Sequence, residues 1–174
     1  MISVSHMTIG GALGVAAAAI IGPGAHPATL AASALAVGIV SHFVCDSIPH
    51  WDHPVAPIVD GELVWTKQVY IFAYADSIIA GLLTLSLWGF IFHFNPLSPF
   101  IWGAAGGYLP DFLDNVPYWK KYVRKLKFFT KFHQFHEWVH SNWEKYYPMP
   151  KYWKLGLATQ LLVGIPLLLY VLMQ

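Results

Sequence analysis

Five long apolar segments occupy most of this chain, at about residues 5–22, 28–48, 68–94, 98–115 and 154–173. Each is about as long as a helix must be to cross the hydrocarbon core of a bilayer, which is about 17–25 residues. Hydrophobic residues make up 56% of the 174 residues and charged residues only 11%. Apolar runs of this length are typical of membrane proteins rather than of soluble cores. The sequence therefore predicts an all-α, polytopic membrane bundle of about five spanning helices.

Two short breaks in this pattern contain proline and glycine, which end helices and form turns. They lie at Gly22–Pro27 and Asn95–Pro99. Both of the hairpins that they create end in a D-x-[IV]-P-x-W sequence, beginning at Asp46 and at Asp114, which predicts two related units. No basic residue precedes the first segment, so we expect a retained helix rather than a signal peptide. The predicted single domain has hairpins at 5–48 and 68–115, an interfacial segment at 116–153 and a C-terminal helix at 154–173.

The basic residues indicate how this bundle is oriented. Threading the five helices alternately through a bilayer places the N-terminus and the loops 49–67 and 116–153 on one face. That face carries all ten Lys and Arg residues. Because loops rich in Lys and Arg stay in the cytoplasm, we expect an inner-membrane protein with a cytoplasmic N-terminus and an external C-terminus.

The same face gathers histidines and aspartates that lie in or beside the apolar segments. Ionisable side chains are costly inside a membrane, so they indicate a functional site by default. Three pairs share a helix face through spacings of three or four residues: His42 with Asp46, Asp111 with Asp114, and His136 with His140. Imidazole and carboxylate groups suit zinc, manganese or iron. We predict a divalent-metal site, with zinc as the first choice, whose ligands are His6, His42, Asp46, Asp111, Asp114, His136 and His140.

Residues 118–153 mix Lys and Arg with Trp, Tyr and Phe. This composition is typical of an amphipathic helix at a membrane surface, where aromatic rings lie at headgroup depth and basic groups meet anionic lipid. We expect such a helix to lie over the ends of the hairpins, with membrane lipid as its partner. The basic run is short and tethered to the membrane, which argues against nucleic acid as a partner.

Within that segment, residues 136–140 match the H-E-x-x-H pattern. In zinc proteases the two histidines of this pattern bind the metal and the glutamate activates a water. We predict catalytic or ligand-supporting roles for Glu137 and for Asp76, which lies in the third apolar segment. A metallopeptidase is only the third choice of function, because the acidic partners Asp111 and Asp114 precede the motif instead of following it.

The set of motifs resembles a family of small bacterial and archaeal inner-membrane proteins, including a LexA-regulated member, that are predicted metal-dependent hydrolases. That family has a histidine near the start of its first helix, a Pro-Asp-x-Asp-His type motif at a helix end, and a late His-rich motif ending in His-Ser. The matching residues here are His6, Pro110-Asp111 with Asp114 or Pro49 with Asp52-His53, and His140-Ser141. Residues 41–53 also resemble the H-x-x-x-D element of zinc-dependent phospholipase C. The resemblance implies a hydrolase.

Together these observations predict a membrane-bound metal-dependent hydrolase that acts at the cytoplasmic face on a phosphoester of a lipid or lipid-linked substrate. The alternative is a non-enzymatic membrane protein whose polar side chains join helices or handle metal ions. A transport path should continue its polar residues to the opposite face. There the first two segments are nearly all Ala, Leu, Ile, Val and Gly, which favours a one-sided site.

Overall fold

The structure is a computed structural model that describes residues 2–51, 58–59, 62–64, 66–144 and 151–174. This part of the chain is almost entirely helical, which confirms the predicted all-α class. Its helices are α1 (Ser3–Ile21), α2 (Pro27–Asp46), α3 (Lys67–Phe92), α4 (Pro99–Asn115), α5 (Pro117–Val123), α6 (Lys127–Glu144) and α7 (Trp153–Leu172). A short antiparallel pair, β1 (Ile58–Val59) and β2 (Glu62–Leu63), lies between α2 and α3 in the sequence.

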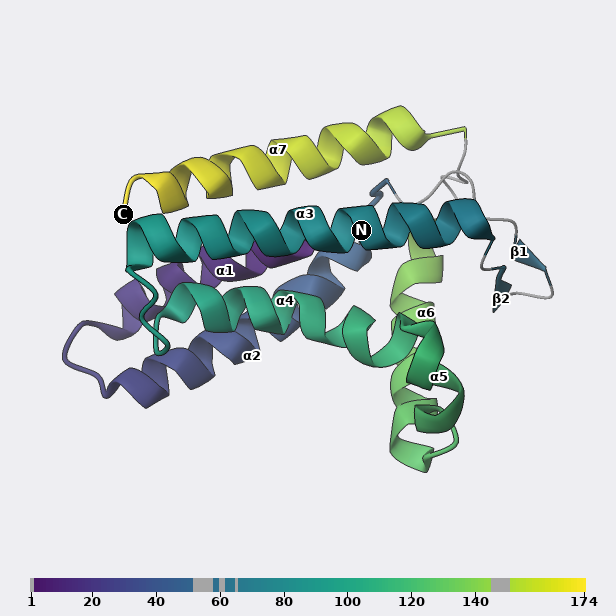
Figure 1. Cartoon of the computed structure of the whole chain (residues 1–174), viewed down its shortest axis with the longest axis horizontal. Coiled ribbons are helices and arrows are strands. Elements are labelled where there is room, and N and C mark those ends of the chain that lie inside the picture. The colour runs from purple at the N-terminus through teal and green to yellow at the C-terminus, as the bar shows by residue number, and fades with distance from the viewer. Residues whose placement is uncertain (1, 52–57, 60–61, 65, 145–150) are drawn as a thin grey trace.

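The long helices lie alongside one another and alternate in direction (Figure 1). Helices α1 and α2 form one hairpin and α3 and α4 form a second, as the apolar segments predict. Helices α1, α2 and α4 pack against one another, while α3 and α7 both pack against α1. The end of α2, the start of α3, the end of α4 and the start of α7 consequently meet at one end of the bundle.

Among the residues that the structure describes, four helices are long and apolar enough to cross a membrane, namely α1, α2, α3 and α7. This finding supports the predicted membrane location. Helix α4 is the fifth helix of the bundle, but it has only 17 residues and contains Pro110. It is not among the four, so the candidate spans number one fewer than the sequence predicts.

Helix starts at the far end of the bundle follow from local capping chemistry. The ring of His26 accepts a hydrogen bond from Ala28 N–H at the start of α2, and Ser98 Oγ accepts one from Phe100 N–H at the start of α4. In both helices a proline occupies the first position, where no N–H donor is needed. The isolated His26 is therefore a helix cap.

Glycines let the three central helices approach backbone to backbone. A Cβ atom on Gly103 of α4 would overlap the carbonyl oxygen of Gly10 on α1, and one on Gly38 of α2 would overlap the carbonyl oxygen of Gly103. Gly107, one turn further along α4, lies in the same way against the carbonyl group of His6. Small residues are the usual means of close helix packing in membranes, because they permit extensive van der Waals contact.

Helices α5 and α6 leave the end of the bundle and run across it rather than along it (Figure 1). Helix α6 has a buried face and an exposed face: His136 and Val139 are buried, whereas Phe128 and Trp138 are exposed. Phe43 of α2 packs edge-on against the rings of Phe135 and His136. This contact fixes α6 over the end of α2, where the sequence places an amphipathic helix.

We expect Gly103→Ala to destabilise the bundle by about 1–3 kcal/mol, the usual cost of overpacking a core. The new methyl group would meet the backbone of Gly10 and Gly14, which outweighs the gain of about 0.5–1 kcal/mol that alanine brings to a helix. Thermal unfolding in detergent measures the loss. The matched control is Gly81→Ala on α3, where the Cβ atom enters open space; equal melting temperatures for both variants would contradict the backbone contact.

Candidate metal centre

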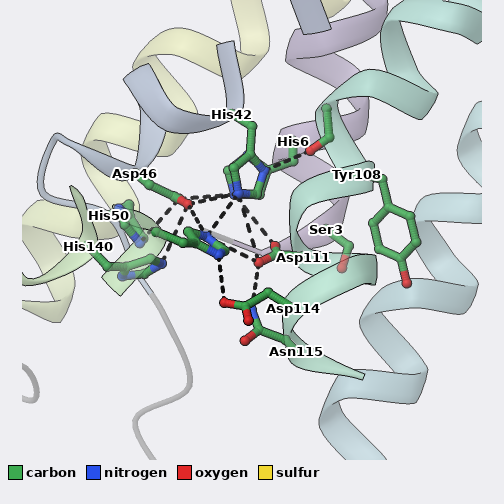
Figure 2. A network of polar contacts seen from close by, with 12 residues as sticks. Ser3, His6, His42, Asp46, His50, Tyr108, Asp111, Asp114, Asn115 and His140 are labelled. Carbon is green, nitrogen blue, oxygen red and sulfur yellow. Dashed lines mark hydrogen bonds and ion pairs between the residues drawn. The ribbon is translucent and has the colours of Figure 1, made fainter. Parts of the chain in front are cut away.

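Asp46, the last residue of α2, is the centre of a cluster of histidines at the end of the bundle (Figure 2). Its side chain is fully buried. Oδ1 lies 3.1 Å from His6 Nε2, and Oδ2 lies 3.0 Å from His42 Nε2 and 3.3 Å from His136 Nε2. Helices α1, α2 and α6 thus bring three imidazole nitrogens to one carboxylate.

Asp111 of α4 faces the same three histidines from another side. Its carboxylate oxygens lie 3.9 Å from His6 Nε2, 3.9 Å from His42 Nε2 and 3.7 Å from His136 Nε2. The side chain is 20% exposed, and Asn115 Nδ2 donates a hydrogen bond of 2.7 Å to its Oδ1. Asp111 therefore borders the cluster and gives it a partly open side.

The glycine contact between α1, α2 and α4 positions the first two rings. His42 Nδ1 lies 2.8 Å from the carbonyl oxygen of Gly107, the residue whose missing side chain lets α4 approach His6. The rings of His6 and His42 stack with their centroids 4.0 Å apart. Asp111 follows Gly107 by four residues, one turn of helix, and so reaches the same region.

Hydrogen bonds fix which tautomer His42 and His136 adopt when their rings are neutral. The carbonyl oxygen of Gly107 can only accept a hydrogen bond, so His42 Nδ1 must donate. His136 Nδ1 likewise donates to Asp114 Oδ2 at 3.1 Å. Both rings therefore direct Nε2 toward Asp46. Metal-binding histidines typically have this arrangement, in which the second ring nitrogen donates to a carbonyl or carboxylate group.

Asp114 contacts His136 from the side away from Asp46. Its Oδ2 also accepts a hydrogen bond of 2.9 Å from His133 Nδ1, and Arg124 Nε donates to its Oδ1 at 3.0 Å. The sequence predicts Asp114 as a ligand together with the others. In the structure it contacts His136 and pairs with Arg124, and it belongs to a separate group of possible ligands with His133 and Glu137.

A divalent cation fits this donor set. Both ring nitrogens of His6 are buried without a hydrogen-bond partner among the described residues, although Nε2 lies within 3.1 Å of an Asp46 oxygen. His42 Nε2 and His136 Nε2 face each other at 3.2 Å. His136 Nε2 also lies within hydrogen-bond distance of Asp46 Oδ2, at 3.3 Å. Ring nitrogens and carboxylate oxygens that converge on one point in this way are in the arrangement expected of ligands to one ion.

The same acceptors bind protons strongly. Burial alone would lower the pKa of His136, but hydrogen bonds to Asp114 and Asp46, with the nearby charge of Asp111, outweigh burial and raise this pKa to about 10. A cation that takes His136 as a ligand must displace this proton, because only the neutral ring has a lone pair to offer.

Four groups of three residues could each hold a metal ion, because the ligand atoms within each group lie within 4.8 Å of one another. The groups are His6/His42/Asp111, His42/Asp46/His136, Asp46/His50/His140 and Asp114/His133/Glu137. The first three surround Asp46 and include every predicted ligand except Asp114. They also include His50, which our sequence-based ligand set omits. The sequence feature that could have identified His50 as a ligand is its position four residues after Asp46.

The two predicted catalytic residues lie elsewhere. Asp76 on α3 accepts hydrogen bonds from the backbone N–H groups of Ser3 at 2.7 Å and Val4 at 3.4 Å. It caps α1, the helix that carries His6. Glu137 is exposed and is grouped with Asp114 and His133. Asp52 and His53, part of the family-like motif, lie outside the described residues.

We expect Asp114→Asn to weaken metal binding by about 10- to 100-fold, the usual effect of removing a carboxylate that orients a histidine ligand. Competition with a chromogenic chelator measures the affinity for zinc or manganese. The control is His93→Asn, a change at the exposed C-terminal cap of α3 at the other end of the bundle. Unchanged affinity in Asp114→Asn would show that His136 does not bind the ion.

We also expect metal affinity to rise with pH. Since the pKa of His136 is raised to about 10, the ring keeps its proton through neutral pH, and that proton competes with the cation. Affinity should increase by up to about tenfold per pH unit below pH 10 for one displaced proton, and His136→Gln should reduce this slope. Titration calorimetry in buffers of different ionisation enthalpy counts the released protons; no release at pH 7 would contradict the assignment.

Comparisons with known proteins add no family to this picture: the chain matches no family model, no curated protein and no solved structure.

Proposed function

We propose that this protein is a membrane-bound metal-dependent hydrolase that cleaves a phosphoester in a lipid or lipid-linked substrate at the cytoplasmic face. The observation that carries the proposal is the convergence of His6, His42 and His136 on Asp46, with Asp111 on the more open side. A bundle held together only by polar contacts needs no such convergence, because each pair would be satisfied by a separate hydrogen bond.

The donor set matches the chemistry of phosphoester hydrolysis. When bound, a divalent cation activates water and offsets the charge that develops on the phosphoryl oxygens. Asp46 and the histidine rings would bind that cation, Asp114 and the carbonyl group of Gly107 hold two of the rings in orientation, and Asp111 borders the site. Overall, water forms a new P–O bond, the P–O bond to the alcohol breaks, and the alcohol leaves with a proton.

The surface beside the centre supports a lipid substrate. Helices α5 and α6 expose large apolar side chains, among them Tyr118, Tyr122, Phe128 and Trp138. Basic residues alternate with these rings along the sequence of α5, α6 and the turn between them: Lys120, Lys121, Arg124, Lys125, Lys127 and Lys131. Because both helices run across the end of the bundle (Figure 1), they lie parallel to the plane of a membrane that the bundle crosses. An apolar and cationic surface in that plane is suited to anionic lipid headgroups.

The geometry favours this reading over a peptidase. His136 and His140 of the H-E-x-x-H sequence both approach Asp46 Oδ2, at 3.3 and 3.6 Å. Glu137 is exposed and is grouped instead with Asp114 and His133, and Asp114 contacts His136 through Nδ1 rather than through the Nε2 that approaches Asp46. In a zinc peptidase this glutamate must reach the water at the metal, whereas here it lies with Asp114 and not with Asp46.

The direct test is hydrolysis by detergent-purified, zinc- or manganese-loaded protein. Substrates are vesicles containing phosphatidic acid or phosphatidylglycerol, and the soluble diester bis(p-nitrophenyl) phosphate. We expect Asp46→Asn and His42→Ala to reduce the rate at least about 100-fold, because a metal supplies several kcal/mol of transition-state stabilisation. The variant His93→Asn should retain the wild-type rate.

Two results separate the parts of this proposal. Phe128→Ser, at a side chain that is 72% exposed, should slow hydrolysis of vesicle lipid and leave hydrolysis of the soluble diester unchanged. Equal rates on both substrates in this variant would argue against a lipid substrate. Stoichiometric metal binding with no phosphoester hydrolysis would exclude the enzyme and favour a metal-handling membrane protein.

A further inference from the structure

The donors around Asp46 outnumber the needs of one ion. Structural and catalytic zinc ions take about four ligands, with one position kept open in catalytic sites. Here two carboxylates and five imidazoles meet in one cluster, formed by Asp46, Asp111, His6, His42, His50, His136 and His140.

The two oxygens of Asp46 face different histidines. Oδ2 lies 3.0 Å from His42 Nε2 and 3.6 Å from His140 Nε2. Oδ1 lies 3.1 Å from His6 Nε2 and 3.8 Å from His50 Nε2. Each oxygen thus faces one histidine of the His6/His42 pair and one of the His50/His140 pair, so this carboxylate lies between the two pairs.

The donors form two compact groups, and Asp46 belongs to one of them and contacts histidines of both. Asp111 lies within 3.9 Å of both His6 and His42, and these three form one compact set of ligand atoms. Asp46, His50 and His140 form another. The ring of His136 lies between them, 3.7 Å from Asp111 Oδ1 and with its centroid 5.8 Å from that of His140.

We propose that this centre holds two divalent cations side by side, bridged by Asp46, one bound by His6, His42 and Asp111 and the other by His50 and His140, with His136 between them as a further ligand. The inference rests on the proposed metal centre and specifies its nuclearity. Pairs of metal ions about 3.5–4 Å apart recur in phosphatases and nucleases, where they stabilise both the attacking and the leaving oxygen. A shared carboxylate is one way to hold two ions at that separation.

The histidines of the second proposed ion position, His50 and His140, are held in orientation by their neighbours, as those of the first are. His50 is fully buried, and its Nδ1 donates to the carbonyl oxygen of Ile48 at 2.8 Å, which directs Nε2 toward Asp46. His140 stands edge-on to His50, with ring centroids 4.8 Å apart. Both rings are thus oriented around the same oxygen pair.

Helix α7 holds the loop that carries His50. Thr159 Oγ1 donates to the carbonyl oxygen of Pro49, and Gln160 Nε2 donates to that of Trp51 at 2.9 Å. At Gly156 the helix backbone approaches the peptide between His50 and Trp51 so closely that a Cβ atom would lie 2.5 Å from it. A ligand supported in this way by rigid neighbours is preorganised for binding.

Metal counting tests the inference directly. The full chain, purified in detergent and saturated with Mn²⁺, is analysed for manganese per chain and by electron paramagnetic resonance. We expect two equivalents and the signal of exchange-coupled ions for the wild type. His50→Ala/His140→Ala should retain one equivalent with an uncoupled six-line signal, whereas His93→Asn should match the wild type.

A milder variant distinguishes loss of the second ion from misfolding of the double variant. Gly156→Ala leaves every ligand in place and displaces only the His50 loop, so it should weaken the second equivalent more than the first. One equivalent with an uncoupled signal in the wild type would overturn the two-ion inference, and if phosphoesters are then still hydrolysed, the proposed function stands. Two coupled equivalents without hydrolysis would support the inference and overturn the function.

Discussion

The close backbone contact among α1, α2 and α4 is the constraint on which the rest of this structure depends. Gly10, Gly38, Gly103 and Gly107 remove the side chains that would keep these helices apart. Helices packed this tightly bring their ends into a small volume, and the residues at those ends are histidine and aspartate. The stacking of His6 on His42 is therefore a consequence of helix packing, rather than of attraction between the rings.

Such a cluster is an expensive way to hold a bundle together. Desolvating a buried charge costs about several kcal/mol, and even a well-made ion pair often does no more than balance that cost. Apolar side chains in place of Asp46 and its histidine neighbours would pack between the same helix ends without this desolvation cost. The proposed cation site thus explains the polar cluster better than a contribution to the stability of the fold does.

Much of this arrangement follows from the sequence, because apolar runs fix the helices and the short Pro-containing breaks fix the hairpins. The placement of the candidate ligands at one end of the bundle follows from alternating helix direction, and their close approach follows from the glycine contacts among α1, α2 and α4. Asp46 contacts His136 at Nε2 and Asp114 contacts it at Nδ1. This difference depends on the rotation of each helix about its axis, which the sequence spacing does not specify, so the sequence assigned both aspartates the same role. His50 lies beyond the helix end, and its position depends on Gly156 of α7, distant in sequence. Asp76 lies in the first helix of the second hairpin, as His6 lies in the first helix of the first, yet its carboxylate caps the N-terminus of α1.

Under these proposals, the transverse course of α6 would couple the centre to the bilayer. His136 and His140 belong to a helix whose exposed face carries Phe128 and Trp138, so a helix that adsorbs to lipid would also supply imidazoles to Asp46. Adsorption and cation binding would then share a single coupling free energy, which acts equally in both directions. Membrane composition would become an effector of this centre, and a bound cation would in turn determine how tightly the protein binds the lipid surface.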